Sequence, residues 1–415
     1  MSKWDALRAK IGDTACDAVK KLYAYYGTEW IKWMAELYDG KTGCFYYANS
    51  SRDYDEFLPD AESTCQAIDM LASLGLFDFA GGKHWTDALP AEMKKRCLAY
   101  IQSLQSDEDG YFYHPQWGKN VGHARIGRDY SQCLGLIEMM GGKPLYKTAT
   151  ERISENARSE EPEKKDTGVP AYLKSKEAFI EYLDKTVADN AHFHDVGHIL
   201  SSQTASIKAA GLADVCMEYL NAYQSPETGY WDEGKQHEYN KISAIIKISG
   251  LYSGLGGRLK YMDKVIDSAI DTVMSERDPD NICFVFNSIG GLGAAIRHVA
   301  EMSDPTATDN TNIDVVLKKV YEKFPEMIDA TIEKLKKFRH PDGSFSFLQG
   351  KSLVNNQGVT ASRGYDEGDI NGTTVAIYYI IYAMFGFMGT PIVCPFTEEN
   401  YKEFVEIIER KTKEA

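Results

Sequence analysis

The stretch DGKTGCFY at residues 39–46 contains a turn that returns three more times along the chain. Each copy has Asp, Ser or Pro near a Gly, and an aromatic residue follows that Gly within two positions. These are turn-forming residues, and Gly accepts the positive φ that many turns need. A recurring turn of one chemistry indicates a repeated structural unit. The later copies are QSDEDGYF at 105–112, QSPETGYW at 224–231 and HPDGSF at 340–345, with RDPDN at 277–281 as a degenerate relative.

Amphipathic segments alternate with these turns. They carry Lys and Glu on one side and Leu, Ile, Met or Tyr at i, i+3 and i+4 on the other, a spacing that predicts helices with one wet face. We expect these outer helices at Thr14–Tyr38, Pro90–Gln105, Ser175–Asp189, Ala213–Gln224, Leu259–Glu276 and Ile313–Phe338.

A second set of segments is poorer in charge and richer in Ala, Gly, Ser and Ile. A helix that is apolar nearly all round is a buried helix, and small residues allow close packing. We expect these inner helices at Asp60–Leu74, Asp129–Met140, Gly197–Ala210, Glu238–Leu255, Asn281–Val299 and Gly368–Phe385.

Six wet helices alternating with six dry ones predict an all-α fold, an (α/α)6 toroid of six helical hairpins. Residues 1–415 then form a single α/α-toroid domain. Two separate helical domains are the alternative, with a break in the charged stretch at about 151–167, which is typical of a solvated loop or insert. Matching repeats on both sides of that stretch favour one ring.

The composition bears on the kind of partner. The formal net charge is −15 and the sequence pI is about 5.2. Nucleic-acid binding needs clustered Lys and Arg, so we expect no nucleic-acid partner. The eight cysteines form no CxxC pair and none adjoins a His, so we expect neither a metal site nor a cofactor.

The sequence also bears on location. The N-terminus has no continuous apolar h-region, and no segment offers a charge-free apolar run long enough to span a bilayer. We therefore expect a cytoplasmic protein without membrane insertion. The sequence makes no prediction of the oligomeric state.

The order of a Gln or Asp, a Gly turn, aromatic residues and then a dry helix resembles the QW-type repeat of terpenoid cyclases and protein prenyltransferases. The alternation of wet and dry helices is also similar to that of (α/α)6 carbohydrate-active enzymes. DGYFYH at 109–114 and ETGYW at 227–231 resemble turns of unsaturated glucuronyl hydrolases. The resemblance covers most of the chain at the level of architecture and implies an α/α toroid.

In such a ring, the N-termini of the inner helices form one mouth, and their free N–H groups favour polar or anionic ligands. At the first opening, Asp60 is a good N-cap, and Glu62 is an early carboxylate on an apolar helix that must face something polar. Its place resembles the acid motif of class II terpene cyclases. Those enzymes need Asp-x-Asp-Asp, whereas this chain has Asp60-Ala-Glu62-Ser63, which argues against protonation-initiated cyclisation.

The second opening gathers His123, Arg125, Arg128, Asp129 and Tyr130 before a dry helix. Arg suits bidentate carboxylate recognition and His suits proton transfer, while a loop of surface charges with Asp129 as a cap is the alternative. Aromatic walls for sugar rings or carbocations are expected nearby. The candidates for these walls are Tyr111, Tyr113 and Trp117.

The third opening holds His192, His194 and His198, followed by Gln203. The HxHxxxH spacing allows a metal site on a loop, but no accompanying motif supports one. We therefore favour a polar lining of the pocket at this opening.

The sixth opening places Asp366, Glu367 and Asp369 before the most apolar helix, with Asn371 close behind. One carboxylate is enough to cap the helix. Crowded carboxylates raise one another's pKa, which suits a general acid beside an ionised partner. An acidic loop in solvent is the alternative.

Ring closure brings the first and sixth openings together, so Glu62 is expected to approach Asp366, Glu367 and Asp369. Two carboxylates across a sugar-sized gap are the minimum equipment for glycoside hydrolysis. The sequence therefore predicts a carbohydrate-active enzyme, a glycosidase, with these four catalytic residues and a small-molecule or oligosaccharide substrate. The predicted substrate-binding residues are Asp60, Tyr111, Tyr113, Trp117, His123, Arg125, Arg128, Asp129, Tyr130, His198, Gln203, Trp231 and Asn371.

Three other functions fit parts of the same pattern. A polysaccharide lyase would use Tyr130 or His123 as base and Arg125 to neutralise a uronate. An isoprenoid cyclase fits the resemblance, although the chain has no DDxxD run and no Cys/His zinc set. A receptor that binds a small ligand without turnover is the third.

Overall fold

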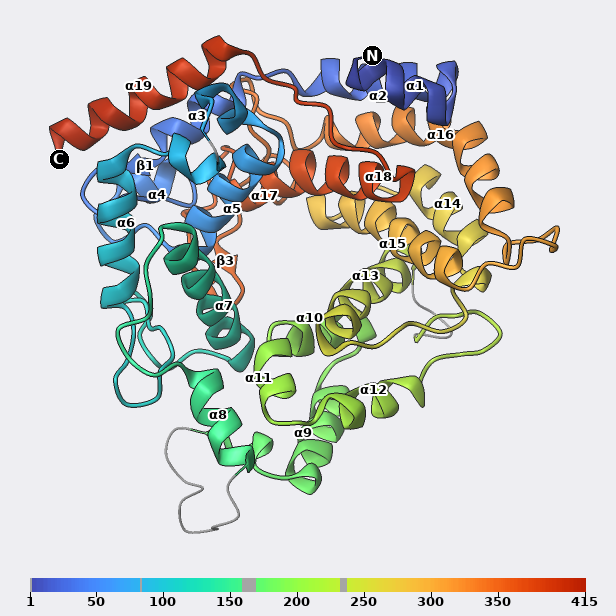
Figure 1. The fold of residues 1–415 in the computed structure, drawn as a ribbon, viewed down its shortest axis with the longest axis horizontal. Coiled ribbons are helices and arrows are strands. Elements are labelled where there is room, and N and C mark those ends of the chain that lie inside the picture. Colours follow the sequence, from blue (N-terminus) through green and yellow to red (C-terminus); the bar gives the residue numbers. More distant parts are fainter. Residues whose placement is uncertain (1, 83, 159–168, 232–236) are drawn as a thin grey trace.

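A computed structural model describes residues 2–82, 84–158, 169–231 and 237–415 (Figure 1). The chain is mostly helical, as predicted. The α-helices are α1 (Lys3–Ile11), α2 (Asp13–Tyr26), α3 (Trp30–Glu36), α4 (Asn49–Asp53), α5 (Ala61–Ser73), α6 (Ala91–Ser103), α7 (His123–Met139), α8 (Ala149–Arg158), α9 (Lys176–Asp189), α10 (Phe193–Ser201), α11 (Thr204–Ala209), α12 (Ala213–Asn221), α13 (Glu238–Leu255), α14 (Ile266–Met274), α15 (Ile282–Glu301), α16 (Ile313–Leu335), α17 (Ile370–Thr374), α18 (Ile380–Met388) and α19 (Glu398–Glu414).

Shorter elements connect these helices. The strands form two small antiparallel hairpins, β1 (Tyr38–Asp39) with β2 (Cys44–Phe45) and β3 (Asn355–Asn356) with β4 (Val359–Thr360). The single-turn helices are η1 (Leu76–Ala80), η2 (Trp85–Ala88), η4 (Ala171–Leu173) and η5 (Met262–Lys264), and η6 (Val375–Tyr379) is a π-turn.

The low-charge helices pack against one another in a closed series. Helix α5 contacts α7, α7 contacts α10, α10 contacts α13, and α13 contacts α15. Helix α15 contacts η6 and α18, and α17, which runs directly into η6, contacts α5 and returns to the start. These elements surround the centre of the view in Figure 1. We call α5, α7, α10, α13, α15 and the α17–η6–α18 segment the ring helices.

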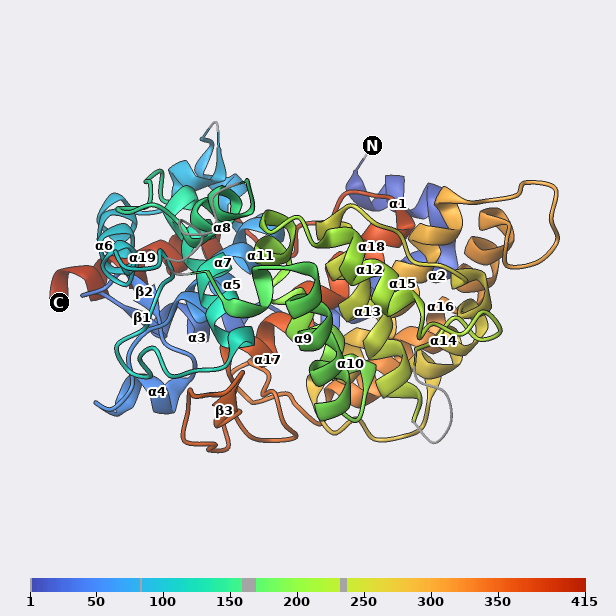
Figure 2. The same cartoon turned by 90° about the horizontal axis from the view of Figure 1, so that it is seen from below.

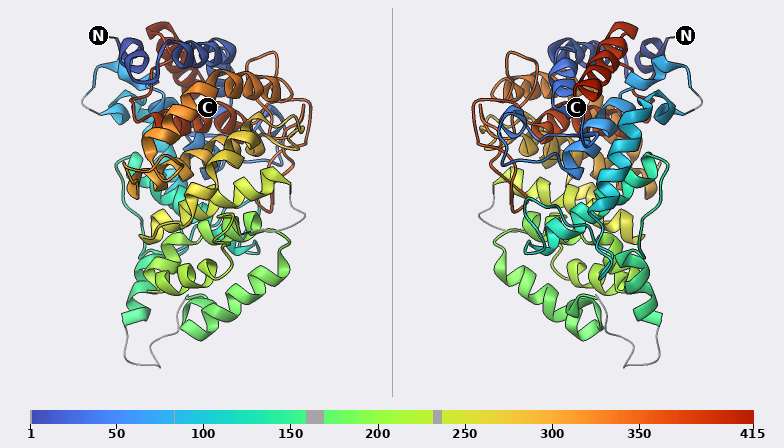
Figure 3. Two further views of the ribbon diagram at one scale, coloured as in Figure 1. Left: turned by 90° about the vertical axis from the view of Figure 1, so that its right-hand side faces the viewer. Right: turned by 90° about the vertical axis from the view of Figure 1, so that its left-hand side faces the viewer.

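The amphipathic helices form a second layer outside the ring helices. Helix α6 packs on α7, α9 on α10, and both α14 and α16 on α15, while α2 packs on α16. One hydrophobic cluster runs through these layers from Leu7 to Ile408. Helix α4 and hairpin β3–β4 lie along one edge of the molecule in Figure 2, opposite α1. The side views show that the helices carrying the two chain ends, α1 and α19, lie on the same side (Figure 3).

The repeated turns share one backbone geometry. In each of the four clear copies the N–H of the Gly donates to a carbonyl oxygen three or four residues earlier, at 2.9 to 3.0 Å. Their φ angles lie between 74° and 83°, a region that favours Gly. The four residues are Gly43, Gly110, Gly229 and Gly343.

Each repeat glycine also lies where a neighbouring segment leaves no room for a side chain. A Cβ on Gly110 would lie 2.3 Å from the carbonyl oxygen of Lys147, just before α8. A Cβ on Gly343 would lie 2.9 Å from the backbone nitrogen of Trp30, at the start of α3. The last turn therefore packs against the beginning of the chain.

Several predicted helices differ from the observed ones in extent. The segment Thr14–Tyr38 is broken at Gly27, whose φ of 62° ends α2. The segment Gly197–Ala210 forms two helices, α10 and α11, because Gln203 leaves the helical region of φ and ψ. The inner helix expected from Asp129 begins six residues earlier, at His123.

The charged stretch predicted as a loop at about 151–167 is helical in its first part. Helix α8 covers residues 149–158 because Thr148 and Glu151 cap its start reciprocally. The Thr148 N–H donates to the Glu151 carboxylate at 2.7 Å, and the Glu151 N–H donates to the Thr148 hydroxyl at 3.4 Å. Residues 159–167 lie outside the described residues.

Among the described residues, two apolar helices are long enough to cross a membrane by length and composition alone. They are Ile282–Glu301 and Ile370–Met388, and 83% and 72% of their most apolar windows are buried inside the protein. Core helices pass the same test, so this is weak evidence for a membrane span. Both helices belong to the ring, where neighbouring helices account for their apolar surfaces.

We predict that Gly110→Ala destabilises the fold more than Gly141→Ala. Both residues have positive φ, but an added Cβ at Gly141 meets no atom within 4 Å. Strain in φ costs about 1–2 kcal/mol in both variants. The overlap at Gly110 adds about 1–3 kcal/mol, measured as the free energy of unfolding in denaturant. Equal losses in the two variants would show that the close approach contributes nothing.

Candidate functional site

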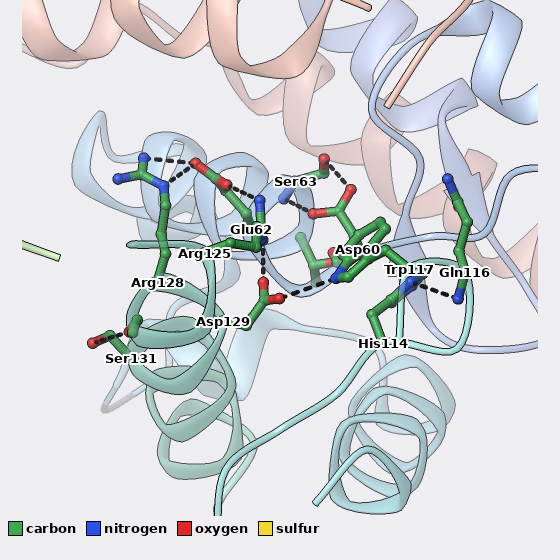
Figure 4. A network of polar contacts seen from close by, with 12 residues as sticks. Asp60, Glu62, Ser63, His114, Gln116, Trp117, Arg125, Arg128, Asp129 and Ser131 are labelled. Carbon is green, nitrogen blue, oxygen red and sulfur yellow. Dashed lines mark hydrogen bonds and ion pairs between the residues drawn. The ribbon is translucent and has the colours of Figure 1, made fainter. Parts of the chain in front are cut away.

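A buried ionic network joins the starts of α5 and α7 (Figure 4). Glu62, in the first turn of α5, accepts a hydrogen bond from Arg125 Nη1 at 2.8 Å and another from Arg128 Nε at 2.6 Å. The two Arg side chains reach one carboxylate because residues three apart lie on the same face of a helix. Arg125 also pairs with Asp129 one turn further along α7. We call these four residues the Glu62 network.

The network determines the ionisation of Glu62. Burial alone would raise the pKa of this fully covered carboxyl, but the charges of Arg128 and Arg125 outweigh burial and lower the pKa to about 2. For Asp129, burial outweighs the Arg125 contact and the pKa is raised. Glu62 is therefore an ionised, firmly held carboxylate at neutral pH.

Arg128 is the member of the network that meets solvent. Its side chain is 24% exposed, whereas that of Arg125 is 1% exposed. Arg128 uses Nε and Nη2 on Glu62, and Nη1 makes no hydrogen bond within the described ranges. Arg128 is thus free to contact a ligand while it stays bonded to Glu62.

Aromatic side chains cover the other side of the network. Trp117 Nε1 donates to Asp129 at 3.3 Å, and the Arg125 guanidinium lies over the Trp117 ring at 5.2 Å. The His114 ring stacks on Trp117 at 3.8 Å, and burial lowers the pKa of His114 to about 4, so this imidazole is neutral. Trp117, a predicted substrate contact, here seals the network.

Asp60 and Asp369 are the N-cap residues of the first and last ring helices, α5 and α17. We call each ring helix, together with the segment that leads into it, a module. Asp60 caps α5 by accepting from the Ser63 N–H at 2.8 Å, and Asp369 caps α17 by accepting from the Gly372 N–H at 2.6 Å. Asn281 caps α15 in the same way. Because the same cap begins three of the ring helices, α5, α15 and α17, helix capping explains it without a catalytic role.

The two capping carboxyls have raised pKa values in the closed interior. Burial raises the pKa of Asp60 to about 6 and that of Asp369 to about 7, although the hydrogen bonds that each carboxyl accepts act to lower its pKa. The Tyr47 hydroxyl is buried, and its pKa is raised by burial, then by the nearby Asp369 carboxylate, and then by the charges of Glu62 and Asp60. Three carboxyl groups therefore surround Tyr47, and all are closed to solvent.

The carboxylates of the sixth opening do not crowd together as predicted. The Asp366 side chain is 88% exposed and lies 3.3 Å from His340. Glu367 is buried and accepts from the Ser50 N–H at 2.8 Å and from the Ser352 hydroxyl at 2.9 Å. Burial, and not a neighbouring carboxylate, is the main cause of the raised pKa of Asp369. The predicted crowding is wrong because successive residues turn toward different neighbours.

The expected approach of the first and last helix starts is observed. Helices α5 and α17 are in contact, and Gln66 Nε2 donates to Asn371 Oδ1 at 3.1 Å. Asn371 is buried at this junction, two residues after its cap, in the place that Glu62 holds in the first module. The residue two positions after the N-cap is therefore a carboxylate in the first module and an amide in the last.

Side chains from opposite ring helices act on one another across the ring. Burial, the largest cause in each case, lowers the pKa of His198 and of Lys247 and raises that of Cys283, and the charge of Arg128 is among the smaller causes for all three. The same charge acts on the pKa of Tyr379, which burial raises. These residues come from α10, α13, α15 and η6, of which only α10 lies next to α7 in the series. Their side chains therefore face the ring interior.

Asp69 is a carboxyl on the interior face of α5. It follows Glu62 by two helical turns, accepts from Cys65 Sγ at 3.3 Å, and is partly exposed. Burial raises its pKa, and it has no ion pair among the described residues. Its charge also acts on the pKa of Tyr378 in η6, which burial raises. Asp69 is thus a partly exposed carboxyl whose pKa lies above the ordinary aspartate value.

Several predicted contacts line a separate pocket of about 230 Å³ beside the first turns of α7. The side-chain oxygen Oε1 of Gln203 accepts from the Tyr172 hydroxyl at 2.5 Å, and the ring of His123 lies 5.0 Å from that of Tyr172. Since Arg128 faces the interior, this pocket and the Glu62 network are distinct places. The predicted residues that line it are Tyr111, Tyr113, His123 and Gln203.

Two other predicted contacts belong to the core. Trp231 is buried and its Nε1 donates to the Leu220 carbonyl at 3.0 Å. Tyr130 is buried and its hydroxyl bonds to Thr150 at 2.6 Å. The structure therefore places Trp231 in packing, where the sequence predicted a sugar-binding surface.

The His cluster does not gather as ligands would. Within the described ranges, no group of three His, Cys, Asp or Glu side chains could hold a metal ion. His198 faces the ring interior, while His194 lies 3.4 Å from Asp195 on α10.

Sequence reasoning missed three interior residues, Asp69, Lys247 and Tyr379. Asp69 and Lys247 stand alone in otherwise apolar helical stretches, AIDML and AIIKIS. A charge on a buried helix needs a polar partner or a water-filled space, and that rule was available from the sequence. Tyr379 carried no such signal, because the π-turn that orients it is a property of the folded chain.

The comparisons with known proteins return no match. No protein-family model, no curated protein and no solved structure is similar enough to this chain to support an inference.

We predict that Glu62→Gln lowers the free energy of unfolding by about 3–5 kcal/mol, because it leaves Arg125 and Arg128 without their shared counter-charge. Glu56→Gln is the matched control, since Glu56 pairs with Arg363 at the surface and its side chain is 50% exposed. The control is expected to change stability far less. A similar small change in both variants would contradict the structural weight given to the Glu62 network.

The stability difference between the wild type and Glu62→Gln should shrink in acid. The folded-state pKa of Glu62 is about 2, below the ordinary value of 4.5, so its contribution is complete above pH 4.5. That contribution is lost as pH falls from 4.5 toward 2, where the carboxyl takes up a proton. Urea unfolding at several pH values measures this, and a difference that stays constant to pH 2 would contradict it.

Proposed function

We propose that the ring is an (α/α)6 toroid and that the chain is a carbohydrate-active enzyme, a glycoside hydrolase that works in the ring interior. The closed series of contacts supports the toroid, as does the turn at Gly343 that packs on the start of α3. The outer layer supports it too, because amphipathic helices cover the outward faces of the ring helices.

The observation that carries the proposal is the pair of carboxyls on the interior face of α5. Arg128 and Arg125 keep Glu62 ionised, whereas burial raises the pKa of Asp69. Hydrolysis of a glycoside needs this division into a proton donor and an ionised carboxylate. Asp69 is the proton donor and Glu62 is the ionised group. This assignment keeps Glu62 from the predicted set and replaces Asp366, Glu367 and Asp369.

The spacing of the pair favours inversion of configuration. Seven residues on a helix rise by about 10 Å, which leaves room for a water molecule beside the sugar. Asp69 gives its proton to the glycosidic oxygen as the bond from that oxygen to the anomeric carbon breaks. Water attacks the anomeric carbon from the opposite face and loses its proton to solvent, while the buried, ionised Glu62 offsets the positive charge that develops on the sugar.

Aromatic surface near Asp69 supports sugar binding, because Tyr378 of η6 lies close enough for the Asp69 charge to act on its pKa, which burial raises. Tyr382 is 59% exposed on α18, and its ring lies 5.7 Å from that of Tyr378. Exposed aromatic rings are suited to stacking against sugar rings.

We predict that Asp69→Asn lowers kcat at least about 100-fold on oligosaccharides, because the proton donor is lost. Aryl glycosides with a good leaving group should lose much less, since their departure needs little protonation. The matched control is Asp78→Asn, an exposed residue of η1, and it should keep wild-type rates. Turnover is followed on a panel of neutral and acidic oligosaccharides, with absorbance of a new double bond to detect elimination. Wild-type rates in Asp69→Asn, or elimination products, would overturn the proposal.

A further inference from the structure

Three basic side chains lie on consecutive ring helices and influence one another's charge. Arg128 is on α7, His198 on α10 and Lys247 on α13, and these helices are neighbours in the ring. Two glycines allow these helices to pack closely. A Cβ on Gly127 of α7 would lie 2.2 Å from the carbonyl oxygen of Ser202, which follows α10. A Cβ on Gly197 of α10 would lie 3.0 Å from the Cβ of Lys247 on α13. Each basic residue is thus next to, or packed on, a point of close helix contact.

Lys247 has no counter-charge bonded to it. Its amine makes no ion pair and no hydrogen bond within the part of the chain that the structure describes, and its side chain is partly exposed. Glu62 lies close enough to act on it, but both Glu62 oxygens already accept from Arg125 and Arg128. Asp129 is likewise occupied by Arg125. Lys247 is therefore a basic side chain without a bonded counter-charge among the described residues, in a chain whose formal net charge is −15.

The surroundings of His198 mark the same place. Gln357, at the turn of hairpin β3–β4, reaches His198 and has a φ of 59°, unusual for a residue other than Gly. Such strain persists where the surrounding structure holds it, and it concentrates at functional sites. Opposite, the ring of Phe286 lies 5.3 Å from that of Tyr379 and gives the space an apolar wall.

We infer that Arg128, Lys247 and His198 form a binding site for an oxyanion carried by the ligand, either a carboxylate or a phosphate. Arg128 offers its free Nη1 in the planar geometry that suits oxyanions, and Lys247 supplies an unpaired point charge. Neutral His198 supplies an N–H. The inference rests on the proposed function, which identifies the ligand as a sugar, and it adds that this sugar chain is acidic.

The test is binding by calorimetry at low salt, with glucuronate, glucose 6-phosphate and glucose as probes. We expect glucuronate or glucose 6-phosphate to bind and glucose not to bind, and the preferred anion identifies the chemical source. Lys247→Met should weaken anion binding about tenfold or more, a change of about 1.4 kcal/mol. Lys247→Arg should retain it. Lys241→Met, on the same helix but six residues away, is the matched control and should bind as the wild type.

The outcomes separate this inference from the proposed function. Equal binding of glucose and both anions, or equal losses in Lys247→Met and Lys241→Met, would overturn the oxyanion site. Anion binding that depends on Lys247 without any glycoside turnover would keep the site and remove the hydrolase. If Lys247→Met fails to fold, loss of binding in folded Lys247→Gln with retention in Lys247→Arg decides in favour, and retention in both decides against.

Discussion

The burial of the Glu62 carboxylate between two guanidinium groups is the interaction on which the rest of the site depends. A charge with no exposed surface is tolerated only when it is paired and hydrogen-bonded, and Glu62 has no exposure. Two consequences follow. The starts of α5 and α7 must lie at one level, because Arg125 and Arg128 both reach Glu62. Arg128 is also fixed with one edge on Glu62 and the other toward the ring interior.

Repetition separates architecture from chemistry in this chain. The glycine turns and the caps at Asp60, Asn281 and Asp369 recur, so one set of backbone requirements explains them all. The second position after each cap does not recur, because it is Glu62 in one module and Asn371 in another. Features that break the repeat concentrate in the interior, and they carry the proposed chemistry. This reasoning moves Asp369 from the predicted catalytic set to the scaffold.

The sequence predicted the helices well and the site only in part. Glycine turns and the contrast between wet and dry helices are local signals, so the positions of α5, α13 and α15 were close to those observed. The first and last ring helices were expected to lie side by side at their starts, and the hydrogen bond between Gln66 and Asn371 joins them there. The roles of Asp366 and Trp231 could not be read locally, because exposure and packing depend on which segments cover them. Asp69 and Lys247 were readable as isolated charges in apolar stretches, and the partners that make them functional were not.

The most direct measurement of the central claim is a carbon-13 NMR titration of the interior carboxyls, with Asp69 and Glu62 signals assigned by substitution. Because burial raises the pKa of Asp69, we predict that Asp69 takes up its proton at a pH above the ordinary aspartate value. Glu62 should remain ionised down to a pH near its folded-state pKa of about 2. Ordinary, closely similar titration of both groups would contradict the account, because the interior would then hold no division between a proton donor and a fixed charge.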